Sequence, residues 1–351
     1  MTHVSYKWLS KLPGDSGQPG LTRRLFLASA VAPVLSAQKP EISSFDISLL
    51  DQPATPNDLF FVHDHFPAPD VTSAGWTLTV GGAVAAPVEI PFDDLAARPR
   101  KGLEVTLECA ENPAGGGLVS HAEWSGVSLA AILQAARPAA DASAIRLEGA
   151  DGFSRVVPIP KAMGPDPLLA LTMNGEKLPV NHGFPLRAII PGWYGMDSVK
   201  WLRKIHVLAG EPPLQDYVRE VRSLLAGRKR ADAVTAMNVK STFSRPVDGA
   251  TLFGRRFTLR GAAWAGENRV RRVEVSIDGG GSWQPARLDS ESKPYAWVCW
   301  SHDWTIARPG TYELAVTATD DQGRQQPVER PSNRVDDYEW NQRQLIQVTV
   351  K

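Results

Sequence analysis

A cysteine stands at the end of an apolar strand, just before a glycine-rich loop. The run Thr106–Asn112 contains Cys109 and is followed by Pro-Ala-Gly-Gly-Gly. The thiolate form of cysteine binds metals, and soft sulfur ligands suit soft metals. Glycines beside it let a bound group approach the backbone closely. Taken alone, a single cysteine is more often a small buried apolar residue, so the rest of the chain must decide.

Histidine, arginine and lysine side chains lie both before and after this stretch, and each could bind an anionic or polar group. Arg187 offers a planar fork to a phosphate and Lys200 offers a point charge. Ser198 can donate a hydroxyl hydrogen bond, and His65 and His182 can bind polar edges. Each histidine alone is equally well explained as a structural residue, so only the ensemble indicates a binding site.

These segments resemble the molybdenum-binding domain of the sulfite oxidase family. The stretch around Cys109, with Ala122–Leu129, resembles the family's Cys-Ala-Gly-Asn and Trp-x-Gly segments. Phe60–His65 resembles its Phe-Val-Arg-Asn-His. Asn181–Arg187 resembles its His-Gly-Phe-Pro-x-Arg, and Pro191–Trp201 resembles its Pro-Gly-x-x-Gly-x-x-x-Val-Lys-Trp. The last two matches are specific and correctly spaced.

The resemblance implies a molybdopterin cofactor, with Cys109 as the protein ligand of molybdenum, and oxygen-atom transfer as the reaction. Further residues that it places around the cofactor are Phe61, Val62, His63, Asp64, His65, Asp151, His182, Arg187, Ser198, Val199 and Lys200. It also implies catalytic positions for Cys109, His63 and Tyr217. A buried structural tyrosine is the alternative for Tyr217. For Asp151 a turn role is nearly as well supported, because Asp-Gly is a turn pair.

The stretch that identifies the metal site also departs from the family. His63 stands where the family has arginine, while Glu111 and Pro113 replace a glycine and another arginine. At an effective dielectric constant of ~20, one pair of unit charges ~4 Å apart is worth roughly 4 kcal/mol before desolvation. Losing two cations should therefore weaken binding of the sulfite dianion. Arg334 could replace a family arginine carried by the C-terminal domain.

Sulfite oxidation nevertheless remains the leading expectation for the reaction. A less charged sulfur or nitrogen compound is a second substrate class. Reduction of S-oxides or N-oxides on the same scaffold, and a non-catalytic family member, are the alternatives. The chain has no Cys-x-x-Cys-His motif for attaching a c-type haem, so we expect a separate c-type cytochrome as the electron acceptor.

The elements that would position these residues belong to two patterns. Up to about residue 232 short strands mix with helices, which indicates an α+β, sulfite-oxidase-type domain over 38–232. Here we predict a helix over Leu129–Ala136, capped by Ser125 or Ser128, and a hairpin turning at Asn174-Gly175 between strands 168–173 and 176–180.

Beyond that point the helical signals vanish. Strands at roughly 8–12-residue spacing predict an immunoglobulin-like β-sandwich over 233–351. The predicted strands are 257–262, 270–277, 283–288, 296–304, 311–319 and 345–350. This region resembles the family's dimerisation domain, which implies a homodimer.

The N-terminal 37 residues have the order of an export signal. Arg23-Arg24 precedes the apolar run Leu25–Leu35 and then small residues, which is typical of a twin-arginine signal and predicts a periplasmic protein. The run is shorter than the ~20 residues that span a bilayer, so we expect no stable membrane insertion. The formal net charge of the 351 residues is zero, which argues against bulk binding to nucleic acid. The two cysteines imply no disulfide framework.

Overall fold

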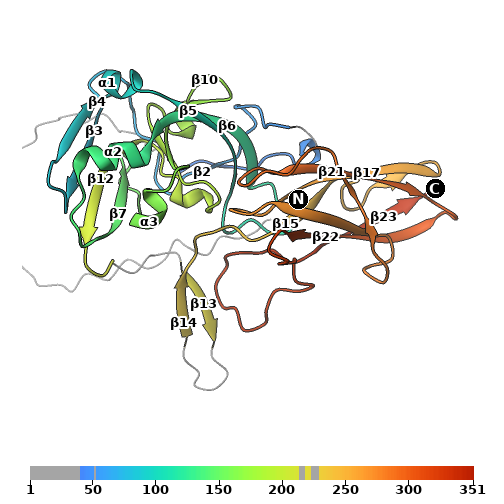
Figure 1. Ribbon diagram of the computed structural model, residues 1–351. Helices are drawn as coiled ribbons and strands as arrows, with labels where there is room; N and C mark the ends of the chain where they lie inside the picture. Colours follow the sequence, from blue (N-terminus) through green and yellow to red (C-terminus); the bar gives the residue numbers. More distant parts are fainter. Residues whose placement is uncertain (1–39, 51–52, 213–217, 223–228) are drawn as a thin grey trace, which may run out of the picture. The chain divides into compact units, whose positions relative to one another are not determined.

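The structure is a computed structural model that describes residues 40–50, 53–212, 218–222 and 229–351 (Figure 1). Strands dominate this part of the chain, and its few α-helices are four to eight residues long. They are α1 (Phe92–Ala96), α2 (Leu129–Ala136) and α3 (Ile159–Ala162). The protein is therefore mainly β, with less helix than the α+β prediction suggested. The predicted export signal lies outside the described residues.

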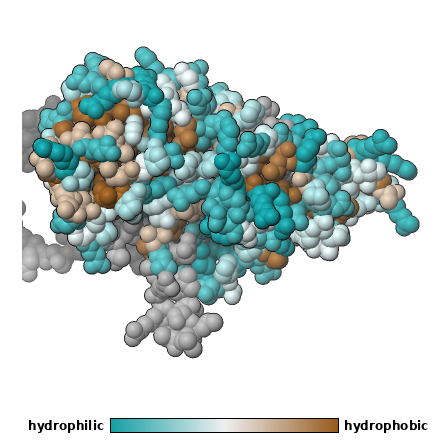
Figure 2. Space-filling view, in the orientation of Figure 1, coloured by the Kyte–Doolittle hydropathy of each residue, from teal (hydrophilic) through white to brown (hydrophobic). Residues whose placement is uncertain are grey.

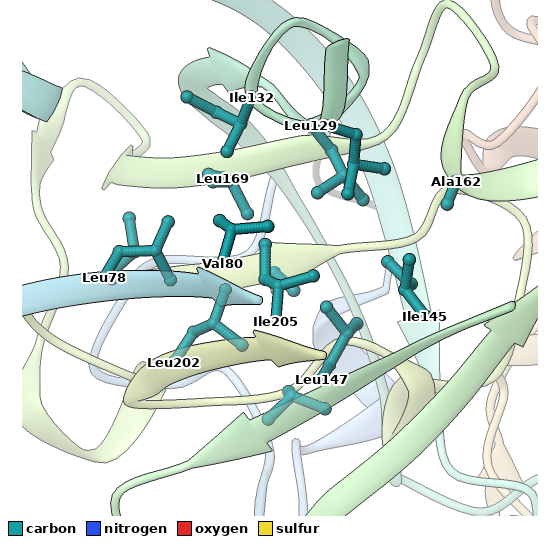
Figure 3. Close-up of a cluster of buried hydrophobic side chains, with 14 of the residues drawn as sticks. Leu78, Val80, Leu129, Ile132, Ile145, Leu147, Ala162, Leu169, Leu202 and Ile205 are labelled. Atoms are coloured by element: carbon teal, nitrogen blue, oxygen red, sulfur yellow. The ribbon is translucent and has the colours of Figure 1, made fainter. Parts of the chain in front are cut away.

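A mixed sheet forms one layer of the N-terminal part. Its strands, in spatial order, are β4 (Val88–Pro91), β3 (Thr77–Gly82), β12 (Leu202–Ala209), β7 (Ala142–Gly149) and β8 (Ser154–Pro158). The β12–β3 pair is parallel and the other pairs are antiparallel. Apolar residues alternate along β3, so Leu78 and Val80 point into the core. There they meet Ile132 of α2 and Leu169 (Figure 3).

A second sheet carries the cysteine loop at its edge. Its strands are β10 (Glu176–Lys177), β9 (Leu168–Met173), β6 (Val119–Ser128) and β5 (Lys101–Glu108), and β11 (Arg187–Ile189) also pairs with β9. The predicted turn at Asn174-Gly175 is confirmed, since both residues have positive φ. The strand after it is shorter than predicted, because Pro179 has no N–H to donate to a ladder.

The predicted helix over Leu129–Ala136 is confirmed as α2. Its N-cap is Ser128, whose hydroxyl accepts from the Ala131 N–H at 3.4 Å. The chain leaves α2 through Arg137, which has a left-handed φ of 55°. The helix buries Leu129, Ile132 and Leu133 completely, so it fixes one face of the N-terminal core.

Short elements complete the N-terminal part. They are β1 (Ile42–Ser43), β2 (Val62–His63), the hairpin β13 (Val218–Arg222) and β14 (Lys229–Ala233), and the 3-10 helices η1 (Ile47–Leu49), η2 (Val180–His182) and η3 (Gly195–Asp197). β2 and η2 carry residues predicted to contact a cofactor, so these short segments position the candidate site.

The C-terminal part has two facing sheets. One consists of β15 (Lys240–Arg245), β17 (Arg256–Trp264), β21 (Val298–Thr305) and β20 (Arg287–Leu288). The other consists of β16 (Thr251–Leu252), β23 (Gln344–Val350), β22 (Gly310–Asp320), β18 (Val270–Ser276) and β19 (Gln284–Pro285). Both contribute to one core that includes Phe243, Val273 and Trp300. A two-layer β arrangement agrees with the sequence, and its immunoglobulin-like class remains a prediction.

One predicted strand, 283–288, is wrong as a single element. The chain forms β19 on one sheet and then β20 on the other. It changes sheet at Ala286, next to Pro285, which cannot donate to a ladder.

Most large apolar side chains lie inside these cores. The face in Figure 2 is mainly hydrophilic, with hydrophobic residues in small separate groups. Within the described residues, no helix has the length and apolarity needed to cross a membrane.

Candidate active site

Cys109 follows the last residue of β5, as the sequence predicted. Its N–H donates to the carbonyl of Leu118 at 2.9 Å, and its own carbonyl accepts from the Asn112 N–H at 3.0 Å. The side chain is half-buried, and Sγ lies 3.3 Å from Nδ1 of His63 on β2. Two strands far apart in sequence therefore bring these two residues into direct contact.

A carboxylate joins this pair. Donor atoms of His63, Cys109 and Glu111 all lie within 4.8 Å of one another. Burial raises the pKa of Glu111, and Asp337 raises it further. Burial and then Lys200 lower the pKa of His63, so its imidazole is held neutral. The position that is arginine in the family thus carries no fixed positive charge here.

The Cys109 thiol is protonated unless a bound cation stabilises its thiolate. Burial is the main cause that raises the pKa of the Cys109 thiol to about 12, and Glu111 and Glu108 raise it too. Coordination to a metal deprotonates a thiol outright, so the site suits a thiolate bound to a strongly charged ion. This donor chemistry fits molybdenum ligation by Cys109.

A second cluster lies around Arg187, on β11. Its side chain is 6% exposed, and it donates to the carbonyls of Ser198 at 3.1 Å and His182 at 3.2 Å. The guanidinium also lies over the Trp124 ring, 5.1 Å from the centroid. Backbone carbonyls and an aromatic ring thus hold a buried cation.

Lys200 provides a second cation in this cluster. Its ammonium donates to Asp64 and, at 2.9 Å, to the carbonyl of Asn181. Burial and the nearby Arg187 lower the pKa of Lys200 to about 8. Burial lowers the pKa of Arg187 to about 9. Burial therefore makes both side chains costly to keep charged unless an anion lies nearby.

The cluster of Asp64, Arg187 and Lys200 is called the cationic cradle below. Oδ2 of Asp64 is buried and has no hydrogen-bond partner among the residues that the structure describes. Two cations against one carboxylate leave a net positive, hydrogen-bonding site. That combination fits a phosphate-bearing group such as molybdopterin.

Two more predicted cofactor residues border the cradle. Nε2 of His182 bonds the Asn57 carbonyl at 2.9 Å, and burial and then Arg187 lower the pKa of His182 to about 3. The hydroxyl of Ser198 accepts from the Ile190 N–H at 3.1 Å. His182 is thus a neutral neighbour of the cations, and the Ser198 hydroxyl fixes the backbone just after β11.

Asp151 and His65 both lie beside Phe153. Oδ1 of Asp151 accepts from the Phe153 N–H at 3.1 Å, which is the turn role foreseen as its alternative. Lys200 also acts on the Asp151 carboxyl, whose pKa burial raises. The ring of His65 lies 5.4 Å from that of Phe153. Asp151 is therefore within electrostatic reach of the cradle, and His65 lies next to the turn that Asp151 closes.

Phe61, Val62 and Val199, three other residues predicted to contact the cofactor, have contacts within the protein. The N–H of Phe61 donates to the Ser120 hydroxyl at 3.1 Å, so it is engaged within the protein. Val62 pairs with Ser43 between β1 and β2. Val199 is 1% exposed in the N-terminal core. Their side chains serve packing, whereas cofactor contact remains a prediction for them.

Residues of the C-terminal domain reach the cysteine loop, which the sequence did not predict. The Glu339 N–H donates to the Ala110 carbonyl at 2.7 Å. Tyr338 and Cys109 both pack against the same buried core cluster. These contacts join residues more than 200 positions apart, so no local sequence pattern could predict them.

The two other predicted residues have different outcomes. Arg334 forms ion pairs with Asp336 at 2.7 Å and with Glu339 at 3.0 Å, so its charge is balanced by carboxylates. Tyr217 lies outside the described residues, and its catalytic role stays a prediction.

Comparison with known proteins follows the same two-part division. The model of the oxidoreductase molybdopterin binding domain matches residues 65–215, and that of the Mo-co oxidoreductase dimerisation domain matches 231–342. Sulfite oxidase of Gallus gallus is 31% identical over 332 residues, which cover 84% of this chain and 72% of that protein. The chain belongs to the sulfite oxidase family.

Other relatives and a solved structure extend the family comparison. Mitochondrial sulfite oxidase of Mus musculus is 32% identical over 311 residues, covering 78% of this chain but 57% of that protein. The crystal structure of the sulfane dehydrogenase SoxCD from Paracoccus pantotrophus superposes with a TM-score of 0.79 at 26% identity, covering 93% of both chains. The fold is thus of the sulfite oxidase type. Because the chain belongs to this family, it is a molybdopterin-dependent oxidoreductase.

Proposed function

We propose that this protein oxidises a reduced sulfur compound by oxygen-atom transfer, with sulfite as the first candidate. The observation that carries the proposal is the thiol of Cys109 at the end of β5, held beside His63. The chicken relative is named sulfite oxidase and the structural neighbour a sulfane dehydrogenase, which supports a sulfur substrate. When bound, the molybdenum cofactor supplies the oxygen transfer and the two-electron change.

The residues of this chain have separate tasks in that reaction. Cys109 would ligate the metal, and the cationic cradle would bind the cofactor's phosphate through Arg187 and Lys200. His65, Asp151, His182 and Ser198 would contact the polar edges of the pterin or its phosphate. His63, which is held neutral, would face the substrate as a hydrogen-bonding group. Tyr217 would hydrogen-bond the substrate or an oxo group.

Electrons must leave through a partner. The sequence attaches no c-type haem, so we propose a separate c-type cytochrome as the acceptor. The matched dimerisation domain supports a homodimer. We also propose export to the periplasm by the twin-arginine route, for which the arginine pair and apolar run of residues 23–35 are the support.

A second candidate, reduction of S-oxides or N-oxides, is favoured by one observation. The group nearest the cysteine is a neutral His63, with Glu111 beside it, where the family has arginine and glycine. Such a site suits an uncharged substrate better than a dianion.

One pair of assays separates the candidates. Protein from a molybdenum-replete host is tested for sulfite-dependent or thiosulfate-dependent cytochrome reduction. It is also tested for sulfoxide-dependent oxidation of a reduced dye. Cytochrome reduction supports the first proposal. If neither sulfur compound reduces the metal while a sulfoxide oxidises the dye, the reductase replaces it.

A further inference from the structure

The residue before the metal ligand is held by the C-terminal domain. Glu108 is the last residue of β5 and is 1% exposed. Its Oε1 accepts from Lys240 Nζ at 2.6 Å, and its Oε2 accepts from Trp264 Nε1 at 2.8 Å. Lys240 begins β15 and Trp264 ends β17, so both donors come from the C-terminal sheets.

The same lysine also fixes the far end of the cysteine loop. Lys240 Nζ donates to the Asn112 carbonyl at 2.7 Å. The Asn112 side chain closes the loop, because Nδ2 donates to Glu108 at 3.0 Å and Oδ1 accepts from the Leu118 N–H at 3.0 Å. Between these ends, the Glu339 N–H holds the Ala110 carbonyl at 2.7 Å.

The C-terminal domain therefore contacts this loop before, after and beside Cys109. We propose that Lys240 and Trp264 are positioning residues, which hold Glu108 and thereby set the direction in which Cys109 presents its sulfur to molybdenum. This inference rests on Cys109 being the metal ligand. It gives the matched dimerisation domain a second role, as a structural part of the metal site.

The chemistry of the contact supports a positioning role over a purely stabilising one. A buried ion pair is weak evidence for stability, since the desolvation of two charges offsets their attraction. Lys240 is 3% exposed and Glu108 1%, so the pair is fully desolvated. What it adds over an apolar contact is direction, because hydrogen bonds have defined geometry.

A matched control lies on the same strand. Lys293 Nζ contacts Glu104 Oε2 at 2.6 Å, and these side chains are 60% and 48% exposed. This ion pair also joins β5 to the C-terminal domain, four residues before Glu108. It lacks any contact with the cysteine loop among the interactions that the structure describes.

The test compares Lys240→Met, Glu108→Gln, Lys240→Arg and Lys293→Met in a Cys299→Ser background. The first readout is the Mo(V) electron paramagnetic resonance spectrum of the cofactor-loaded full chain. The second is the rate at which a thiol reagent labels Cys109 in cofactor-free full chain. Thermal unfolding is recorded for every variant, so that general destabilisation is seen separately.

We expect Lys240→Met and Glu108→Gln to shift or broaden the Mo(V) spectrum and to speed labelling about tenfold, through local opening of the loop. Lys240→Arg should largely restore both readouts, and Lys293→Met should leave both unchanged. Wild-type spectra and labelling rates in Lys240→Met, with only a lowered unfolding temperature, would overturn the proposal.

A further variant covers the case in which Lys240→Met does not fold. Glu108→Gln with Lys240→Met removes both buried charges and avoids an unpaired one. A folded double variant with a shifted spectrum and faster labelling supports the positioning role, and wild-type values reject it. If the wild-type protein binds no molybdenum, the proposed function fails, whereas the labelling rates still test the loop.

Discussion

The cationic cradle and the cysteine loop both hold ionisable groups, but they differ in which charge is left without a partner of opposite sign. In the cradle, Arg187 and Lys200 share the carboxylate of Asp64, and Asp151 acts on Lys200 from outside the cluster, so the cradle itself has one more cation than carboxylates. Around Cys109, the nearest groups are a neutral His63 and the carboxylate of Glu111. One region is prepared for an anion, whereas the other has lost cations that the family carries.

The difference means that cofactor binding and substrate choice must be considered separately, although family membership alone would suggest that both are kept. The cradle keeps the residues that a phosphate-bearing cofactor needs, so the cofactor is retained. The loop changes the charge that a substrate meets, so family membership alone does not define the substrate. Arg334 does not reverse this change, since Asp336 and Glu339 balance it.

The largest expected effect is at the metal ligand. Cys109→Ser should lower activity at least ~1,000-fold, on the order of 4 kcal/mol of transition-state stabilisation, because a hydroxyl does not replace a soft thiolate. Steady-state assay with molybdenum analysis measures this. The matched control is Cys299→Ser, which changes the other cysteine, and retained activity in Cys109→Ser would reject the ligand assignment.

A change in the cradle should affect cofactor retention more than substrate affinity. Arg187→Met removes charged hydrogen bonds worth about 1.5–3 kcal/mol, so we expect roughly ten- to hundredfold weaker cofactor binding. Pterin content after gel filtration measures it. Arg269→Met, at an exposed ion pair with Glu291, is the control. An unchanged pterin content in Arg187→Met would contradict the assigned role.

The cradle should also make the cofactor-free protein sensitive to acid. The pKa of His182 is about 3 in the folded chain, whereas an unperturbed histidine titrates near ~6.5. The unfolded chain therefore binds a proton first, and stability falls as the pH drops from ~6.5 toward the folded value. Between pH ~7 and ~5 the loss from this group is on the order of 2 kcal/mol.

Denaturant unfolding at both pH values measures this loss. His182→Gln should reduce the difference in stability between them, because the substituted side chain does not titrate. The same difference in wild type and variant would show that His182 is not the group responsible.

The smallest expected effect is at the loop, where a family residue can be restored. His63→Arg places a fixed cation beside Cys109, and we expect the KM for sulfite to fall about two- to fivefold, as for a partly screened charge pair. Sulfite-dependent cytochrome reduction measures it. Raising the salt concentration should diminish the gain. A KM for sulfite that rises in the variant would mean that position 63 does not attract the sulfite anion.

The residues of the cradle and the place of Cys109 at the end of a strand could be predicted because they lie in local motifs. His182 and Arg187 lie in one short segment and Ser198 and Lys200 in another, so resemblance could place them. Local signals also gave the Asn174-Gly175 turn and the Ser128-capped helix.

What the sequence could not predict depends on contacts between distant segments. The Lys240–Glu108 pair joins residues 132 positions apart, and neither residue belongs to a motif. The division of 283–288 between two sheets depends on which partner strands are nearby. Tertiary pairing overrides local strand preference in such places.

Molybdenum and pterin analysis of the purified wild-type protein tests the central claim most directly. The protein is made in a host that synthesises the cofactor and is supplied with molybdate, and both components are measured per chain. The predicted result is near-stoichiometric molybdenum and pterin, with the molybdenum lost in Cys109→Ser. Their absence from folded wild-type protein would contradict the account.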